Sequence, residues 1–217
     1  MIDGVALVVE AEAVWLTAER EVSVISSAFA GGGVARARTI LNLHVPKNFP
    51  CADADATVGA FARRHGLPPP WVGMLTSAWT ERAATAMETA GGIRALVVAT
   101  VGLSNASAAG LTGRAVPAPG TINTVVVVDA DPEPAAMVNL VMTVTEIKTA
   151  LLLDAGVKSV DGHPATGTST DAVVVAATRR ARRCRFGGPI SDLGWVVARA
   201  ARQALGAGVR RWLEDNR

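Results

Sequence analysis

The sequence predicts an α+β fold, a single domain of residues 1–217 in which a mixed or mostly antiparallel sheet is covered by helices. Two features of the predicted secondary-structure segments indicate this class. Most of these segments are short runs rich in β-branched residues, and only three have the charge order and caps of helices. The two kinds do not alternate strictly, so a doubly wound parallel sheet fits less well. Half of the residues are hydrophobic and 18% are charged, as in globular proteins.

Eight strands are expected along the chain. The first three, at 4–11, 13–18 and 21–29, are separated by only a few residues and are expected to form an antiparallel meander. AGGGVARA at 30–37 is expected to be a flexible turn, since glycines outside a strand-turn-helix frame make only a weak phosphate loop. The later strands are expected at 71–77, 82–89, 94–104, 121–129 and 171–178.

Valines run almost without interruption through 125–128 and 173–175, which predicts two strands buried on both faces. The stretches PAPGTINTVVVVD at 117–129 and ATGTSTDAVVVAA at 165–177 each place Gly-Thr and polar residues before these valines. A tight turn that enters a strand explains both stretches, because glycine and short hydroxyl side chains favour turns. Such loops lie at the rim of a core, where functional sites are often built.

Three helices are expected. Residues 52–67 begin with acids and end with bases and a glycine, which is the charge order of a helix. Asp131 is expected to cap a long helix that ends at Gly156, since proline is tolerated in a first turn. The closing helix, ISDLGWVVARAARQALGAGVRRWLEDN, is expected to be capped by Ser191 or Asp192.

Composition and charge argue against nucleic-acid and membrane partners. The formal net charge is only +2, which gives no field that favours nucleic acid. RRARRCR at 179–185 could face phosphates or anionic lipid, but such a run is more often a solvated surface turn. The apolar segment 137–156 contains Glu146 and Lys148, so a buried helix is expected and not a membrane span. The N-terminus lacks the pattern of a signal peptide, and the cytoplasm is therefore the expected location.

No metal site or cofactor is expected. Cys51 and Cys184 lie far apart without Cys-x-x-Cys spacing, so neither a disulfide framework nor a zinc site is indicated. The histidines at 44, 65 and 163 are scattered as well. The sequence contains no nucleophile elbow, H-E-x-x-H, Walker or Rossmann motif.

Glu146 and Lys148 are candidates for chemistry on the expected helix 131–155. They lie on different sides of that helix and cannot simply pair with each other. Each either reaches solvent or meets a partner from another segment, because an unpaired buried ion is costly. A helix edge with a solvent-reaching lysine and a functional site explain the pair equally well.

Loops at strand ends supply further hydroxyl and amide groups. Ser104 and Asn105 lie at the end of one expected strand, and Thr121 and Asn123 lie at the start of another. Both pairs could bind a carbonyl group or could only stabilise a loop through Asx turns. HVPK at 44–47 could supply an acid, a base or an anion contact. A lone loop histidine, however, is more often simply at the surface.

Six stretches taken in order resemble one known family. They are NLHVPKNF, VGLSNASAAG, PGTINTVVVVD, MTVTEIKTALLLDAGV, ATGTSTDAVVVAA and FGGPISDLGWVVARAARQAL. Together they run from about residue 40 to 206 and are similar to the adenosylcobinamide amidohydrolase family of corrinoid salvage. The first 38 residues match more loosely, and the arginine run has no counterpart.

The resemblance implies hydrolysis of the amide that joins the aminopropanol arm to the corrin ring of adenosylcobinamide. The implied products are adenosylcobyric acid and 1-amino-2-propanol. The cobalt belongs to the corrinoid substrate, so no cofactor of the protein is implied. A non-catalytic corrinoid- or nucleotide-binding module is the alternative function. The oligomeric state is left open and includes a homo-oligomer.

Amide hydrolysis needs a nucleophile or activated water, a base, donors for the oxyanion and an acid for the leaving amine. Glu146 or Asp171 is the expected base. Lys148 or His44 is the expected proton donor or charge stabiliser. Thr121, Asn123, Ser104 and Asn105 are expected to contact the oxyanion or the carbonyl group.

Two mechanisms stay open. Either Thr121 or Thr168 acts as a covalent nucleophile activated by an adjacent base, or water is activated directly. The residues expected to contact the substrate are Asn42, Lys47, Ser104, Asn105, Asn123, Thr166, Thr168, Ser169 and Thr170.

Overall fold

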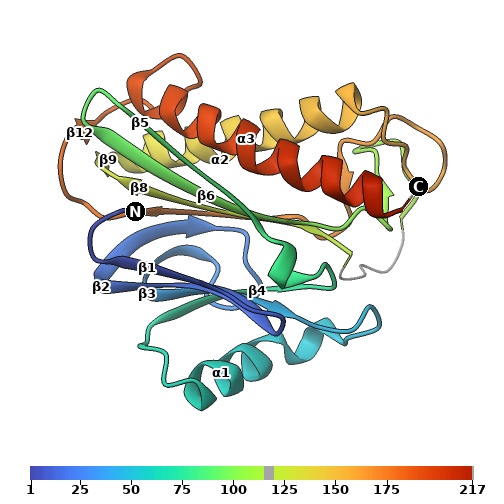
Figure 1. The fold of residues 1–217 in the computed structure, drawn as a ribbon, viewed down its shortest axis with the longest axis horizontal. Helices are drawn as coiled ribbons and strands as arrows, with labels where there is room; N and C mark the ends of the chain where they lie inside the picture. The colour runs from blue at the N-terminus through green and yellow to red at the C-terminus, as the bar shows by residue number, and fades with distance from the viewer. Residues whose placement is uncertain (115–119, 217) are drawn as a thin grey trace.

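One eight-stranded sheet forms the centre of the molecule, with strand order β4-β3-β2-β11-β8-β6-β5 and with β1 paired to β2 (Figure 1). The structure is a computed structural model, and it describes residues 1–114 and 120–216. The strands are β1 (Val5–Val9), β2 (Ala13–Ser26), β3 (Gly33–His44), β4 (Trp71–Thr76), β5 (Ala84–Ala90), β6 (Ile93–Val101), β8 (Ile122–Asp129) and β11 (Ala172–Ala177). Among the described residues of this sheet, β3 with β4 and β8 with β11 are parallel and the other pairs are antiparallel, so the predicted mixed sheet is confirmed.

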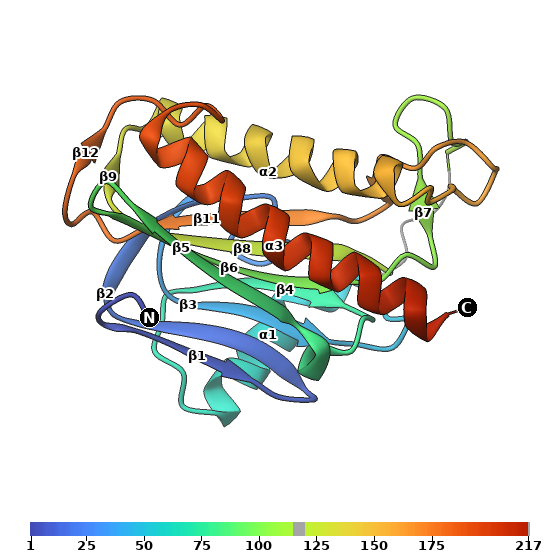
Figure 2. The same cartoon turned by 45° about the horizontal axis from the view of Figure 1, so that its top comes forward.

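Helices cover the two outer sides of this sheet. Helix α1 (Ala54–Arg64) lies under the half formed by β1 to β4, whereas α2 (Pro134–Asp154) and α3 (Asp192–Asp215) lie over the other half (Figures 1 and 2). The 3-10 turns are η1 (Cys51–Asp53) and η2 (Thr80–Arg82). The remaining short strands pair as β7 (Ala106–Ser107) with β10 (Gly167–Thr168) and β9 (Asp131–Pro132) with β12 (Arg183–Cys184).

The sheet folds over itself, so that its two halves face each other across a hydrophobic core. This core joins side chains of β2, β3 and β4 to side chains of β6, β8 and β11. Along β8, Val125 and Val127 enter the core between the halves, whereas Val126 and Val128 face α2 and α3. Every residue of β8 and β11 is buried, which confirms the prediction from the valine runs.

The parallel pairing of β8 and β11 depends on helix α2. Two parallel neighbours cannot be joined by a tight turn, and here the crossover is α2. As a result both strands begin at the same edge of the sheet. The two stretches PAPGTINTVVVVD and ATGTSTDAVVVAA therefore enter the core side by side, apart from residues 117–119, which lie outside the described residues.

Helix α2 is buried along one face only. The helix is long and apolar enough to cross a bilayer, since an 18-residue stretch of it has a mean hydropathy of 1.5. In the fold, 39% of that stretch is buried. Its inner residues pack against α3 and β11. Val138 and Met142 on its outer side are exposed, so the predicted buried helix is confirmed for its inner face only.

Two expectations about strands are wrong. Residues 13–18 and 21–29 were expected to form separate strands, but a β-bulge between Thr17 and Val22 keeps both on the single strand β2. The turn expected at 30–37 ends at Gly33, where β3 begins. Pairing with β2 outweighs the local turn preference of the glycines.

One of the two expected helix caps is wrong. Glu133, not Asp131, is the N-cap of α2, and it makes no side-chain capping bond. Asp131 instead lies in β9, where its carboxylate pairs with Arg179 at 2.8 Å. The other cap is confirmed, because the Ser191 hydroxyl accepts a hydrogen bond from the backbone N–H of Gly194.

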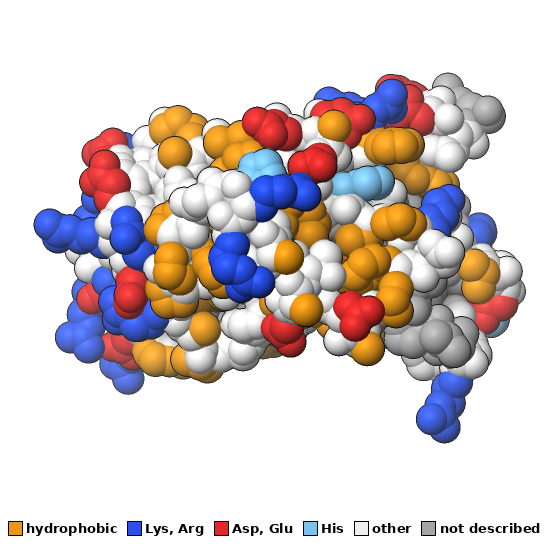
Figure 3. Space-filling view, turned by 90° about the horizontal axis from the view of Figure 1, so that it is seen from below, with side chains coloured by type: hydrophobic (Ala, Val, Ile, Leu, Met, Phe, Trp, Pro, Cys, Tyr) orange, Lys and Arg blue, Asp and Glu red, His pale blue; other side chains and the backbone are white. Residues whose placement is uncertain are grey.

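The arginine run at 179–185 is a surface turn after β11 with a compensated charge. Four of its arginines form ion pairs with acids of other segments: Arg179 with Asp131, Arg180 with Asp129, Arg182 with Asp192, and Arg183 with Glu133. On the face below the sheet, basic and acidic side chains are interspersed as well (Figure 3). This pattern agrees with the solvated surface turn that the sequence favours.

Two glycines of α3 provide a test of the packing of this helix on the sheet. A Cβ at position 208 would lie 2.6 Å from Val101 Cγ2, whereas a Cβ at position 206 would meet nothing closer than 3.4 Å. We expect Gly208→Ala to lower the free energy of unfolding by about 1–3 kcal/mol, because the helix would be pushed from β6. Gly206→Ala is the control and is expected to be neutral or stabilising by up to about 1 kcal/mol. Urea unfolding measures both, and equal effects would contradict the described contact.

Asp129 at the end of β8 provides a test by pH. Burial raises the pKa of this carboxyl, but hydrogen bonds from Thr178 and Arg94 outweigh burial and hold the pKa below its usual value. The ionised form is therefore bound better in the folded state, and this stability is present above about pH 4 and lost as pH falls. We expect Asp129→Asn to lower the free energy of unfolding at pH 7 by about 1–3 kcal/mol, with a smaller difference at pH 3. Asp154→Asn, at an exposed carboxylate, is the control, and a pH-independent difference for Asp129→Asn would contradict the assignment.

Candidate functional site

The carboxylate of Asp171 joins the N-terminal end of β8 to the turn that precedes β11. Its Oδ1 atom accepts hydrogen bonds from the backbone N–H of Ile122 at 2.9 Å and from the Thr168 hydroxyl. Its Oδ2 atom accepts from the backbone N–H of Thr168 at 3.0 Å and forms an ion pair with Lys148 of α2. The side chains of Lys148 and Asp171 are each only 12% exposed. One carboxylate thus holds its own turn, the neighbouring turn and the crossover helix together.

Gly167 is required by this ion pair. A Cβ at position 167 would lie 2.4 Å from Asp171 Oδ2 and 2.7 Å from Lys148 Nζ. The glycine in GTSTD therefore leaves room for the two charges, beyond the turn-forming role that the sequence suggests. Of the residues expected to be catalytic, Lys148 and Asp171 meet here.

A chain of buried polar side chains crosses the core between the sheet halves. The Thr121 hydroxyl donates to Asn123 Oδ1 at 3.2 Å, and Asn123 Nδ2 donates to Asn42 Oδ1 at 2.8 Å. Asn42 Nδ2 in turn donates to the Thr100 hydroxyl at 2.9 Å. All four side chains are buried. Because β3, β6 and β8 are not all neighbours in the sheet, this chain fixes the register of one half against the other.

The outer loops close over this end of the sheet. Asn105 Nδ2 donates to the Ser169 hydroxyl at 2.7 Å, and the Thr166 hydroxyl accepts from the backbone N–H of Ala109 at 3.0 Å. β7 and β10 pair between the same two loops. Gly120 packs tightly here, since a Cβ would lie 2.7 Å from Ser104 Oγ. The structure thus brings together most of the loop residues expected from the sequence, with Thr170 in the same turn as Ser169.

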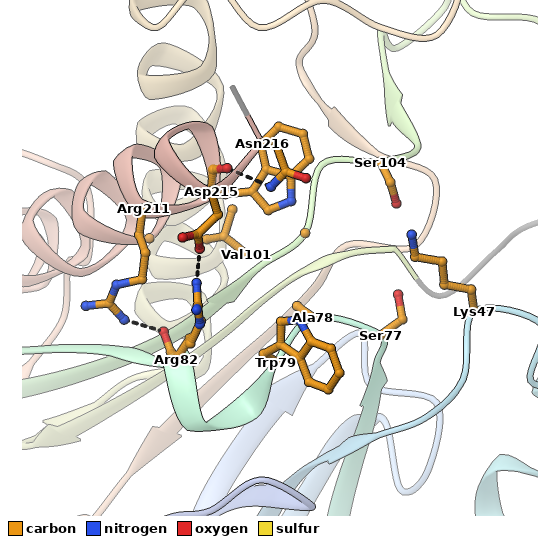
Figure 4. Close-up of a pocket in the computed structure, with 13 residues that line it drawn as sticks. Lys47, Ser77, Ala78, Trp79, Arg82, Val101, Ser104, Arg211, Asp215 and Asn216 are labelled. Atoms are coloured by element: carbon orange, nitrogen blue, oxygen red, sulfur yellow. Dashed lines mark hydrogen bonds and ion pairs between the residues drawn. The ribbon is translucent and has the colours of Figure 1, made fainter.

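A cavity of about 380 Å³ opens beside these loops (Figure 4). Its walls come from the loop after β3, from the loop after β4 with η2, from the end of β6 and from the last turns of α3. The lining residues are Lys47, Ser77, Ala78, Trp79, Arg82, Val101, Gly102, Ser104, Gly208, Arg211, Trp212, Asp215 and Asn216. In Figure 4 the amine of Lys47 points toward the hydroxyl of Ser104, with Ser77 on the same side.

Charged groups on the α3 side of the cavity are tied to one another. Arg82 forms an ion pair with Asp215, and Arg211 donates to the backbone carbonyl oxygen of Arg82 at 2.7 Å. Within residues 1–114 and 120–216, Lys47 has neither an ion pair nor a hydrogen bond through its amine. The Lys47 end of the cavity therefore offers an amine that a ligand can contact.

His44 lies behind the cavity and contacts one of its walls. Its Nδ1 atom donates to the backbone carbonyl oxygen of Ala78 at 2.9 Å, since a carbonyl oxygen can only accept. The imidazole stacks on the indole of Trp79 with 5.0 Å between ring centroids and 12° between planes. The ring also lines a separate groove beside α1.

Glu146 lies apart from the other candidates. It is exposed on the outer side of α2, where it lines a groove with Trp195, Arg199 and Arg202 of α3. Lys148, two residues further, points inward to Asp171. The expectation that these two charges face different ways is confirmed, and Lys148 has found its partner in another segment.

Seven polar or tryptophan residues of the cavity were not predicted from the sequence: Ser77, Trp79, Arg82, Arg211, Trp212, Asp215 and Asn216. Ser77 ends the expected strand 71–77 and Trp79 lies two residues beyond it, and Ser104 likewise ends the expected strand 94–104. The α3 residues gave no local signal, because only the packing of α3 on β6 brings its last turns to the cavity. Within the part of the chain that the structure describes, no three His, Cys, Asp or Glu side chains gather as a metal site.

A polar cavity at the ends of buried strands is the kind of place where small-molecule enzymes bind their substrates. Residues 2–217 match the adenosylcobinamide amidohydrolase family, and the chain belongs to that family. This is an amidohydrolase family that acts on a corrinoid. The match confirms the resemblance seen in the six stretches.

Solved structures with a similar chain course include the PH0078 protein from Pyrococcus horikoshii OT3, with a TM-score of 0.48 and 10% sequence identity. That similarity covers 95% of this chain and 83% of the other. A beta-aminopeptidase from Burkholderia sp. gives a TM-score of 0.47 and 13% identity, over 94% of this chain and 79% of the other. Comparison with curated proteins gave no match.

The contact of Gly167 with the ion pair can be tested with two alanine variants. We expect Gly167→Ala to force Lys148 and Asp171 apart and to lower the free energy of unfolding by about 2–4 kcal/mol, since it strands a buried charge. Gly188→Ala is the matched control, because a Cβ there meets nothing within 4 Å. Its effect is expected to stay within about 0.5 kcal/mol. Chemical denaturation measures both, and a stable Gly167→Ala protein would show that the ion pair is not held against this glycine.

Proposed function

We propose that this protein hydrolyses the amide between the aminopropanol arm and the corrin ring of adenosylcobinamide, releasing adenosylcobyric acid and 1-amino-2-propanol. The observation that carries the proposal is membership of the adenosylcobinamide amidohydrolase family over nearly the whole chain. The polar cavity supports it, because it offers hydroxyl and amine groups to a small polar arm. The cobalt enters with the substrate, and the reaction serves corrinoid salvage in the cytoplasm.

In this proposal the chemistry lies at the Lys47 end of the cavity. Ser104 is exposed there, whereas Thr121 and Asn123 are fully buried and Thr168 is bonded to Asp171. Ser104 and Lys47 therefore replace the threonines as the favoured nucleophile and base. A serine activated by a lysine amine is a known arrangement in acyl-transfer enzymes.

The proposed reaction has two steps. The Ser104 hydroxyl attacks the amide carbonyl carbon, and its proton passes to the Lys47 amine and from there to the leaving nitrogen. The C–N bond breaks, 1-amino-2-propanol departs, and an ester to Ser104 remains. Water then attacks the ester, Lys47 takes its proton and returns one to Ser104, and adenosylcobyric acid is released.

Several other candidate residues hold the Ser104 side of the cavity in place. The buried chain from Thr121 to Thr100 and the Asp171 carboxylate hold the loops that carry Ser104 in place. Both oxygen atoms of Asp171 already accept two polar contacts each, so it acts here as a positioning residue and not as the base. Glu146 has no part in this proposal, because it lines a different groove.

Incubation with adenosylcobinamide, followed by chromatography of the products, tests the proposed function. The wild-type protein is expected to yield the free cobyric acid and 1-amino-2-propanol. Ser104→Ala and Lys47→Met are expected to lower kcat by about 10²–10⁴-fold without unfolding the protein. The controls are Ser107→Ala, in β7 outside the cavity, and Lys158→Met, at an exposed lysine, and both should retain activity.

The mechanism predicts further readouts. An ester intermediate should be visible as a mass increase on Ser104 after rapid quenching, and release of the amine should precede release of the acid. Full turnover in Ser104→Ala would favour directly activated water. Substrate that remains intact but co-elutes with the protein would instead support the corrinoid-binding module.

A further inference from the structure

Trp79 is an exposed aromatic side chain at the mouth of the cavity. It follows β4 and precedes η2, and 61% of its surface is open to solvent. One face of the indole is covered by the stacked imidazole of His44. The open area therefore belongs to the opposite face and the edge of the ring, beside the cavity that Trp79 lines.

The indole is held in this position before any ligand arrives. His44 is fixed by its hydrogen bond to the carbonyl oxygen of Ala78, the residue next to Trp79. The two rings lie within 12° of parallel. A rigid aromatic face loses little conformational freedom on binding, which is why tryptophan is enriched at recognition sites.

The size of the cavity decides how a corrinoid can lie on it. A volume of about 380 Å³ admits a side arm or an axial ligand but not a whole corrin ring with its amide side chains. The ring must then lie across the mouth, where Trp79 is exposed. Polar groups of Ser77, Arg82 and Asn216 surround the same mouth and can bond to amides or to a heteroaromatic base.

We propose that Trp79, backed by His44, is the surface on which a planar conjugated part of the substrate stacks. This inference rests on the proposed function, since it concerns how that substrate is held. Two parts of adenosylcobinamide have such a face, the adenine of the axial adenosyl ligand and the conjugated rim of the corrin. Stacking of a base on an aromatic side chain contributes enough free energy to change affinity by about 10- to 100-fold.

Equilibrium dialysis of the Ser104→Ala protein, read by corrin absorbance, measures affinity without turnover. Adenosylcobinamide and cyanocobinamide are the two ligands, and only the first carries adenine. We expect Trp79→Ala to raise the Kd for adenosylcobinamide by about 10- to 100-fold and Trp79→Phe to raise it far less. Trp195→Ala is the control, because Trp195 is also exposed but lines the groove between α2 and α3.

The ligand series tells the two sources apart. Loss of affinity for adenosylcobinamide alone assigns the stack to adenine, and equal loss for both corrinoids assigns it to the corrin rim. An unchanged Kd for both ligands in Trp79→Ala overturns the inference. The measurement stays informative if the proposed hydrolysis is not observed, because it reads binding. Normal hydrolysis with unchanged Kd would remove the stacking surface and leave the proposed function intact.

Discussion

Strand β11 is the constraint on which the rest of this structure depends. It pairs antiparallel with β2 and parallel with β8, so it joins the two halves of the folded sheet. Because a layer lies on each side of it, all six of its residues must be small or β-branched and buried. Each valine of such a strand contributes about 1.5–3 kcal/mol through burial, and no face is left for polar side chains. Polar chemistry is therefore confined to the strand entrances and to the loops beyond them.

The site follows from that confinement. The crossover through α2 places the entrances of β8 and β11 next to each other, and the folded sheet brings the ends of β3, β4 and β6 to the same edge. Polar side chains at or just beyond the ends of these five strands thus meet at one end of the molecule. Those that point between the halves, such as Asn42 and Asn123, are satisfied by one another. Those that point outward, Lys47 and Ser104, line a cavity and remain available to a ligand.

The sequence predicted most of the architecture, because valine runs and helix caps are local signals. Prediction from the sequence failed where contacts with a distant segment determine the structure. Strand β3 begins at Gly33, within a stretch of glycines that favours a turn, because β2 supplies its hydrogen bonds. The same division holds for the site. Ser104 and Asp171 were found from their positions at strand ends, whereas Arg211 and Asp215 reach the cavity only through the docking of α3. Glu146 was favoured by its place on an apolar helix, but periodicity alone could not tell which side of α2 faces the sheet.

The carboxylate of Asp171 has a further consequence for motion at the site. It bonds at once to its own turn, to the backbone of Ile122 and to Lys148, so the first residue of β8 and the turn before β11 are tied to α2. Separating them would leave Asp171 and Lys148 as unpaired charges in a largely buried place. On the opposite wall, the exposed side chains of Arg82 and Asp215 form an ion pair, and the buried hydroxyl of Thr80 anchors η2 to the backbone oxygens of Glu10 and Ala11.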